Sequence, residues 1–232
     1  MTSLPDRYRA RESRTLAARL RRALTPPAPL VMNPREPADF PLGRWNLYVG
    51  GAGRRVEGYL NLDLFALPGV DVAADAHALP FPSALFTRIE CDAVLEHVAN
   101  PAVVLCELVR VLAPGGYLHL VTPFCHPFHE YPRDYRRFTL DGLLQLARET
   151  DPALEAAAQG WRTGPAATWL VFTLEFAKSL APWTWYRALA HFTLGWLLFP
   201  LRYLDLWLLR TPRAARLGNH CYLWLRKPAS HS

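Results

Sequence analysis

The stretch WNLYVGGAG (45–53) opens the part of the chain that decides the fold. It is an apolar run that ends in a glycine turn, which is typical of a buried strand leading into a ligand-binding loop. The elements predicted after it are strands over 58–65, 70–76 and 84–94, a helix over 101–112 and a strand over 117–124. Strands and helices in this alternation predict an α/β fold with a mostly parallel sheet. In such sheets, ligands bind at the carboxyl ends of the strands.

The composition bounds the class of protein. With 232 residues, 51% of them hydrophobic, the chain can bury one sizeable core. A net charge of +6 permits anionic partners without choosing among them. The first 25 residues are rich in Arg and lack an apolar core, so we expect no secretory signal. The four cysteines form no C-x-x-C pair and are predicted to be reduced thiols of a bacterial cytoplasmic protein: Cys91, Cys106, Cys125 and Cys221.

Two segments flank or interrupt the predicted domain. Residues 1–41 are expected to form a basic helix over 6–24 followed by a proline-rich linker. Residues 42–232 form the main domain, with an apolar, aromatic helical insertion over 165–210. A helix over 139–150, capped at Thr139, precedes this insertion, and the strand over 220–228 closes the chain.

Three interpretations of the aromatic insertion compete. It covers the acceptor site as a lid, forms a dimer interface, or lies in the membrane surface with Arg side chains reaching toward the headgroups. No uncharged run approaches the 20 or so residues of a bilayer span, and Pro200 is expected to split the segment. On one continuous helix, Arg187, His191, Arg202 and Asp205 would share a narrow polar stripe. We therefore predict a cytoplasmic protein, either free or peripheral at the inner membrane surface.

Residues at the predicted strand ends suit a nucleotide-like cofactor. Backbone N–H groups in the glycine turn of Gly50, Gly51 and Gly53 can approach a ligand closely. Asp63 ends the second strand, where an acid can accept both hydroxyls of a ribose; it could equally cap the strand. Asp75 could bind an adenine amino group while the backbone of Ala76 contacts the ring, or it could be a plain turn acid.

Taken in order, the segments VGGAG (49–53), NLD (61–63), ADAHALPF (74–81), CDAVLEHV (91–98) and RVLAPGGYLHLVTPF (110–124) resemble the type 11 class I methyltransferases. The resemblance covers about residues 44–145. It implies a doubly wound, seven-stranded, Rossmann-like sheet with an antiparallel last strand, and S-adenosyl-L-methionine as cofactor. It also implies that the glycine turn and Asp92 lie near the methionine end, that Asp63 with Leu64 contacts the ribose side, and that Asp75 and Ala76 bind adenine.

The chain departs from that family pattern at two places. Tyr48 replaces the usual acid at the end of the first strand, so backbone carbonyls or Asp92 would have to hold the cofactor's amino group. Asp63 stands only ten positions after Gly53, whereas a parallel crossover usually takes a dozen or more residues. The first helix is therefore predicted to be truncated to about one turn, which weakens the contribution of its dipole.

The segment PFCHPFHEYPRDYRRFT (123–139) follows a strand end, where an acceptor substrate would lie. It resembles a motif of some of these methyltransferases, filled here by His129, Asp134, Tyr135 and Arg137. His129 is a candidate acceptor contact or general base, oriented by Asp134 or Tyr135. The alternative is a loop fixed by an Asp134–Arg137 ion pair. His97 is a second candidate base, or a structural residue beside the fourth strand, and the spacing of Cys125, His126 and His129 matches no standard metal site. No metal is predicted.

The predicted function is methyl transfer from S-adenosylmethionine to a small-molecule, glycan or lipid-linked acceptor, at a hydroxyl. An NAD-dependent oxidoreductase is disfavoured because the acid follows the glycines too closely and no full helix fits between them. The other alternative is a catalytically inactive cofactor-binding scaffold or membrane-associated interaction protein. Nucleic acid is not expected as a partner, because no aromatic-basic stacking surface is evident.

Overall fold

The computed structural model describes residues 24–229, which divide into two compact units. The sheet unit comprises residues 36–124, 129–160 and 221–229, and the helical unit comprises residues 24–35, 125–128 and 161–220. The predicted basic helix over 6–24 lies almost wholly outside the described residues. The expected boundary between 1–41 and 42–232 stays a prediction, since the division into units follows the packing and not the linear order.

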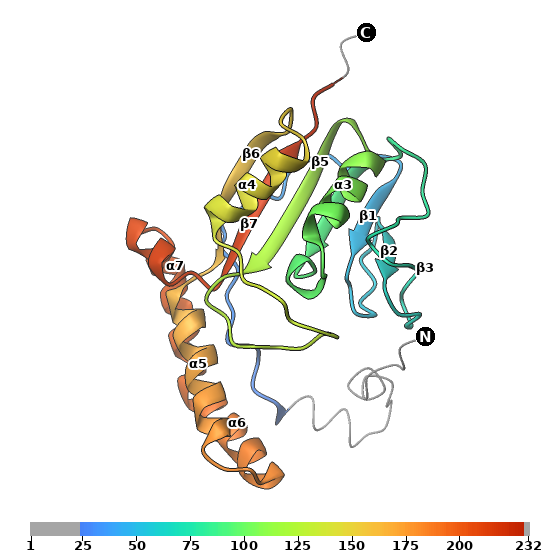
Figure 1. Cartoon of the computed structure of the whole chain (residues 1–232). Coiled ribbons are helices and arrows are strands. Elements are labelled where there is room, and N and C mark those ends of the chain that lie inside the picture. The colour runs from blue at the N-terminus through green and yellow to red at the C-terminus, as the bar shows by residue number, and fades with distance from the viewer. Residues whose placement is uncertain (1–23, 230–232) are drawn as a thin grey trace. The chain divides into compact units, whose positions relative to one another are not determined.

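A seven-stranded sheet forms the centre of the sheet unit (Figure 1). Its strands lie in the order β3-β2-β1-β4-β5-β7-β6, and the five from β3 to β5 are parallel neighbours. Their bounds are β1 Asn46–Val49, β2 Leu60–Asp63, β3 Val72–Ala73, β4 Phe86–Asp92, β5 Leu112–Pro123, β6 Glu155–Thr163 and β7 His220–Arg226.

The last strand runs against its neighbour β5. The Gly115 N–H donates to the carbonyl of Lys227, whereas Thr122, farther along β5, contacts Cys221. Residue numbers that rise along β5 therefore fall along β7. The predicted fold, a mostly parallel seven-stranded sheet with a helical insertion before the last strand, is confirmed. The strand β6 was not predicted from the sequence, because its run EAAAQGWRT fully buries only its last residue and carries few large apolar side chains.

Two helices accompany the sheet. α3 (Pro101–Val111) follows the short 3-10 turn η2 (Leu95–His97), packs on β5 and contacts α4 (Leu140–Thr150) (Figure 1). Their starts follow ordinary capping rules. Pro101 stands at the first helical position, and the Thr139 hydroxyl accepts a hydrogen bond from the Gly142 N–H, as predicted. The inward side chains of β1, β4, β5 and α3 are fully or almost fully buried and form the core.

The connections between β1 and β2, β2 and β3, and β3 and β4 contain no helix. The prediction of a one-turn helix after the glycine turn is therefore wrong, because residues 50–59 are consumed by turns. Chain segments that form no helix contact polar side chains of the sheet. The buried Arg88 guanidinium on β4 donates to the carbonyls of Ala38 and Phe40, and the Phe40 ring lies 4.3 Å from that of the buried Trp224.

The helical unit contains α5 (Pro165–Ser179) and α6 (Thr184–Leu198), which pack against each other as a hairpin (Figure 1). They are followed by η3 (Phe199–Leu204), α7 (Asp205–Leu208) and η4 (Pro212–Arg216). α6 ends just before Pro200, so the predicted split is confirmed. The proposed polar stripe is wrong because there is no continuous helix to carry it. Arg202 donates to the carbonyl of Ala28, and Asp205 is buried.

Asp205 caps α5 from a distance in the sequence. Its carboxylate accepts hydrogen bonds from the N–H groups of Gly164, Ala166 and Ala167, at 2.8–3.1 Å. These donors belong to the first turn of α5, which has no earlier helical carbonyls to bond. Burial raises the pKa of Asp205, and the three N–H groups oppose that effect by stabilising its charge. The return segment of the insertion therefore completes the start of its first helix.

Candidate cofactor and acceptor site

The carboxyl ends of β1, β2 and β4 bring the predicted donor residues to one edge of the sheet. Val49 at the end of β1 pairs with Leu62 on one side and with Cys91 on the other. The residues that follow Val49, Leu62 and Cys91 are Gly50, Asp63 and Asp92. They therefore lie next to one another at the ends of the three strands. This is the edge at which open α/β sheets bind ligands.

The turn after β1 takes a conformation that requires small residues. Gly50 and Gly53 have positive φ angles of 81° and 78°. A Cβ atom on Gly50 would lie 2.1 Å from Cγ2 of Val94, which no packing could accommodate without movement. Positive φ at these two positions favours glycine, and a Cβ atom on Gly50 would require the Val94 side chain to move.

Asp63 holds the glycine turn in place. One carboxylate oxygen accepts a hydrogen bond from the Ala52 N–H at 2.8 Å, and the other accepts one from the Phe65 N–H at 3.2 Å. The side chain is buried, but each carboxylate oxygen has a further lone pair for a hydroxyl. Leu64 beside it is 47% exposed, which offers a flat apolar contact at the same edge.

Asp75 and Ala76 follow β3 in a tight turn. The Asp75 carboxylate accepts a hydrogen bond from the His77 N–H and lies 2.6 Å from the His77 ring nitrogen Nδ1. The backbone hydrogen bond from His77 lowers the pKa of Asp75, so the acid is ionised. Ala76 is buried. The turn geometry anticipated as the alternative interpretation is present, and the exposed side of the carboxylate is still able to bind a donor.

Tyr48, the residue in place of the family's acid, lies between two charged groups. Its hydroxyl lies 3.5 Å from Oδ2 of Asp92, and Arg54 donates to the same hydroxyl at 3.3 Å. The Arg54 guanidinium also sits 5.5 Å from the centre of the Tyr48 ring. Sequence reasoning missed Arg54. Its position directly after the glycine turn was the signal that could have identified it.

The segment 123–139, called the acceptor segment here, brings together His129, Asp134 and Arg137. Asp134 accepts hydrogen bonds from the His129 N–H at 2.8 Å and from both terminal nitrogens of Arg137. The Arg137 guanidinium and the His129 N–H hold the pKa of Asp134 low, at about 2, against the effect of burial. The ion pair foreseen as a structural explanation therefore exists, and it also fixes His129 from one side.

Of the other residues considered in the sequence analysis, His97 and Tyr135 belong to the sheet unit and His126 to the helical unit. The ring of His97 meets that of His129 edge to face, with 4.9 Å between ring centres. Tyr135 has an exposed side chain and donates its backbone N–H to the carbonyl of Glu96, so Asp134 and not Tyr135 contacts His129. His126 belongs to the helical unit, where its ring lies 3.0 Å from the side-chain oxygen of Asn219.

Comparison with known proteins finds sequence relatives for part of the sheet unit. Residues 60–120 match the family model described as a methyltransferase domain. The chain is 32% identical over 120 residues to a demethylmenaquinone methyltransferase of Mycobacterium tuberculosis strain H37Ra, a match that covers 51% of this chain and 44% of the relative. It is also 37% identical over 86 residues to an uncharacterised 37.1 kDa protein in a transposon of Streptomyces fradiae, covering 34% of this chain and 25% of that one. The chain thus spans less than half the length of these relatives.

Solved structures show the same fold. The [4+2]-cyclase SpnF superposes with a TM-score of 0.54 at 19% identity, over 95% of this chain and 84% of that one. A methyltransferase-like protein of Bacillus halodurans superposes with a TM-score of 0.50 at 17% identity, over 83% and 96%. The fold is that of the class I methyltransferases. In sequence, the match to the methyltransferase domain family is confined to residues 60–120.

Proposed function

We propose that this chain transfers a methyl group from S-adenosylmethionine to a hydroxyl of a small-molecule, glycan or lipid-linked acceptor. The observation that carries the proposal is the meeting of Gly50, Asp63 and Asp92 at one edge of a sheet whose sequence matches the methyltransferase domain. Bound there, the cofactor supplies a sulfonium that is already a strong electrophile. The protein's part is to align the reactants and to exclude water.

The residues at the sheet edge fit the parts of that cofactor. The turn of Gly50, Gly51 and Gly53 presents N–H groups to the methionine end, and Asp63 accepts the ribose hydroxyls with its remaining lone pairs. The exposed Leu64 contacts the ribose side of the cofactor together with Asp63. At the other positions, Asp75 and Ala76 contact the adenine edge, and Asp92 lies near the amino group.

The segment 123–139 contributes the acceptor contacts in this proposal. His129 is held by Asp134 on its Nδ1 side, and its side chain remains 32% exposed. A partly exposed imidazole with one fixed side suits the binding or deprotonation of a hydroxyl. His97 lies beside it and would act on the same group. Tyr135, whose side chain is exposed, would contact the acceptor at the rim.

Cofactor binding is the direct test. By isothermal titration of S-adenosylmethionine, we expect the wild-type chain to bind and Leu64→Ser to bind about ten-fold more weakly, because an exposed apolar contact is worth roughly 1.5 kcal/mol. Asp63→Asn should weaken binding further. Glu57→Ala, at an exposed position in the connection between β1 and β2, is the control variant. No binding by the wild-type chain would refute the proposal, and binding without transfer to any acceptor would favour the scaffold alternative.

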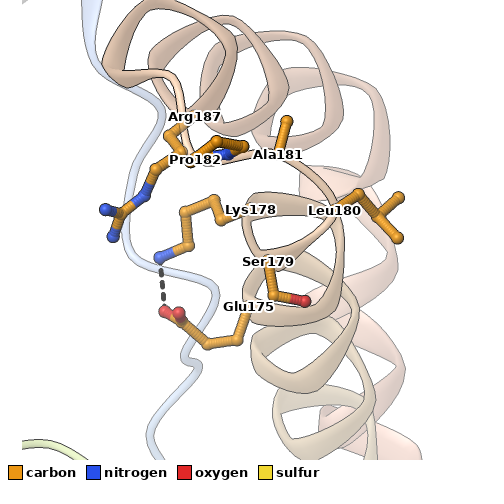
Figure 2. Close-up of a pocket in the computed structure, with 7 residues that line it drawn as sticks. All are labelled: Glu175, Lys178, Ser179, Leu180, Ala181, Pro182 and Arg187. Carbon is orange, nitrogen blue, oxygen red and sulfur yellow. Dashed lines mark hydrogen bonds and ion pairs between the residues drawn. The ribbon is translucent and has the colours of Figure 1, made fainter.

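We further propose that the helical unit binds the membrane surface, which suits a lipid-linked acceptor. Exposed aromatic side chains concentrate near the turn between α5 and α6, where Trp183 and Trp185 are 59% and 64% exposed. The same turn forms a pocket in which Lys178, paired with Glu175, and Arg187 lie on one side while Leu180 points away (Figure 2). Aromatic rings with nearby cations are the composition of interfacial segments.

No helix among residues 24–229 is long and apolar enough to cross a bilayer. Flotation with vesicles containing an anionic lipid tests the surface interpretation. We expect the chain to float with the vesicles, and Trp183→Ala with Trp185→Ala to remain at the bottom. A wild-type chain that stays unbound would refute it and would favour the lid or dimer interpretation, both of which stay predictions.

A further inference from the structure

Glu96 is a buried carboxylate that lacks an ordinary partner. It follows β4 in the turn η2, its side chain is fully inaccessible to solvent, and neither of its oxygens accepts a hydrogen bond from the described residues. Burial raises the pKa of Glu96 to about 8. A buried carboxyl group without a hydrogen-bond partner is costly, so its retention at this position calls for an explanation.

Two imidazoles point at this carboxylate. Nε2 of His97 lies 3.6 Å from Oε1 of Glu96, and Nε2 of His129 lies 3.9 Å from the same oxygen. Both separations exceed the length of a hydrogen bond, so neither imidazole is hydrogen-bonded to this oxygen. One ligand atom from each residue lies within 4.8 Å of the other two.

In each imidazole, the second ring nitrogen, Nδ1, already faces a polar group of the protein. Nδ1 of His97 lies 2.5 Å from the carbonyl oxygen of Arg133, which can only accept, so Nδ1 carries the proton and Nε2 keeps its lone pair. Nδ1 of His129 faces the Asp134–Arg137 pair, 3.4 Å from an oxygen of Asp134. Histidines whose other nitrogen is held by a carbonyl or carboxylate are typical of metal sites.

From these contacts we infer that Glu96, His97 and His129 form a binding site for one divalent transition-metal ion. Ligand atoms about 2.1 Å from a shared ion lie roughly 3.0–3.4 Å apart. The three ligand atoms here lie within 4.8 Å of one another, so they would have to move closer together, by up to about 1.8 Å, to bind one ion. Two imidazoles and one carboxylate favour an ion such as Zn²⁺ or Fe²⁺ over Mg²⁺, which prefers oxygen. Three protein ligands leave coordination positions open.

The open positions suggest a role in the reaction, and this part rests on the proposed function. An acceptor hydroxyl at an open position would lose its proton to solvent more easily, because the cation stabilises the negative charge on oxygen. That oxygen's electron pair would form the bond to the methyl carbon while the carbon–sulfur bond breaks and sulfur keeps its pair. His129 would then position the acceptor through the ion instead of acting as a general base.

Titration of the full, untagged, chelator-treated chain with Co²⁺ tests the site without any methyl transfer. We expect one Co²⁺ per chain with visible ligand-field absorption, displaced by Zn²⁺. Glu96→Gln and His129→Ala should each weaken binding by more than about 100-fold, since loss of a second-sphere group alone costs ten- to 100-fold. His191→Ala, on α6, should bind as the wild type does.

A wild-type chain without this absorption and without a Zn²⁺-dependent rise in melting temperature overturns the inference, as does unchanged affinity in the folded Glu96 and His129 variants. If both variants unfold, the Co²⁺ absorption of the wild-type chain and its Zn²⁺-dependent change in melting temperature decide whether the metal site exists. S-adenosylmethionine titrated into the same chelated sample separates the two ideas. Cofactor binding without metal binding sinks the metal site alone, whereas metal binding without cofactor binding sinks the proposed function alone.

Discussion

The two units use the same kinds of apolar side chain in opposite ways. In the sheet unit, Phe86, Leu105 and Trp224 are almost completely inaccessible to solvent. In the helical unit, Phe176, Trp183 and other aromatic residues are more than half exposed, and α6 buries only Ala190 and Gly195. An apolar pattern therefore predicts a helix or a strand but does not decide whether the side chains are buried. Exposed aromatic surface on this scale marks a binding surface.

The largest effect that would test this comparison is expected from the buried ring of Phe86. Phe86→Ala should lower the free energy of unfolding by about 3–5 kcal/mol, because it removes apolar contacts and leaves a cavity in the core. Urea unfolding followed by circular dichroism measures the change. A loss below about 1 kcal/mol would mean that this core is not packed as described.

A smaller, more local effect is expected at Asp205. Asp205→Ala should leave three buried N–H groups at the start of α5 without an acceptor, at a cost of about 2–4 kcal/mol. Hydrogen exchange at Gly164, Ala166 and Ala167 should accelerate, while amides of β4 keep their protection. Asp205→Asn, which retains one acceptor oxygen, should lie between the variant and the wild type. Unchanged exchange in Asp205→Ala would contradict the capping role.

The smallest effect on stability is expected from the exposed rings. Trp183→Ala combined with Trp185→Ala should change the free energy of unfolding by less than about 0.5 kcal/mol, because substitutions at exposed positions remove few contacts. The same variant should lose vesicle binding. A large loss of stability would show that these rings are buried in solution, and the contrast between the two units would fail.

Much of the fold could be predicted from local signals. The alternation of strands and helices, the Thr139 cap and the break before Pro200 each depend on residues close in sequence. The strand β6 could not be predicted in this way, because it pairs with β7, which follows the whole helical insertion in the sequence. The sequence predicted about one helical turn after β1, whereas the structure has no helix there. Turns and the hydrogen bonds of Asp63 and Asn61 occupy the whole connection.

The candidate site was predicted in part. Asp63 and Asp92 could be placed because strand ends in a parallel sheet share one edge. Glu96 was passed over, since an acid beside a histidine signals nothing until tertiary packing buries it and brings His129 from 33 residues away. Arg54 was missed for a similar reason. Its role depends on the Tyr48 hydroxyl, which the pattern of the sequence does not orient.

The carboxylate of Asp205 has a consequence for how the chain is made. It lies 41 residues after Gly164, whose N–H it accepts. A growing chain that has just produced α5 therefore lacks the acceptor for that helix's first turn, and it gains one only after η3 has been synthesised. The first helix of the insertion therefore stays without its capping acceptor until the return segment that carries Asp205 has left the ribosome and folded back.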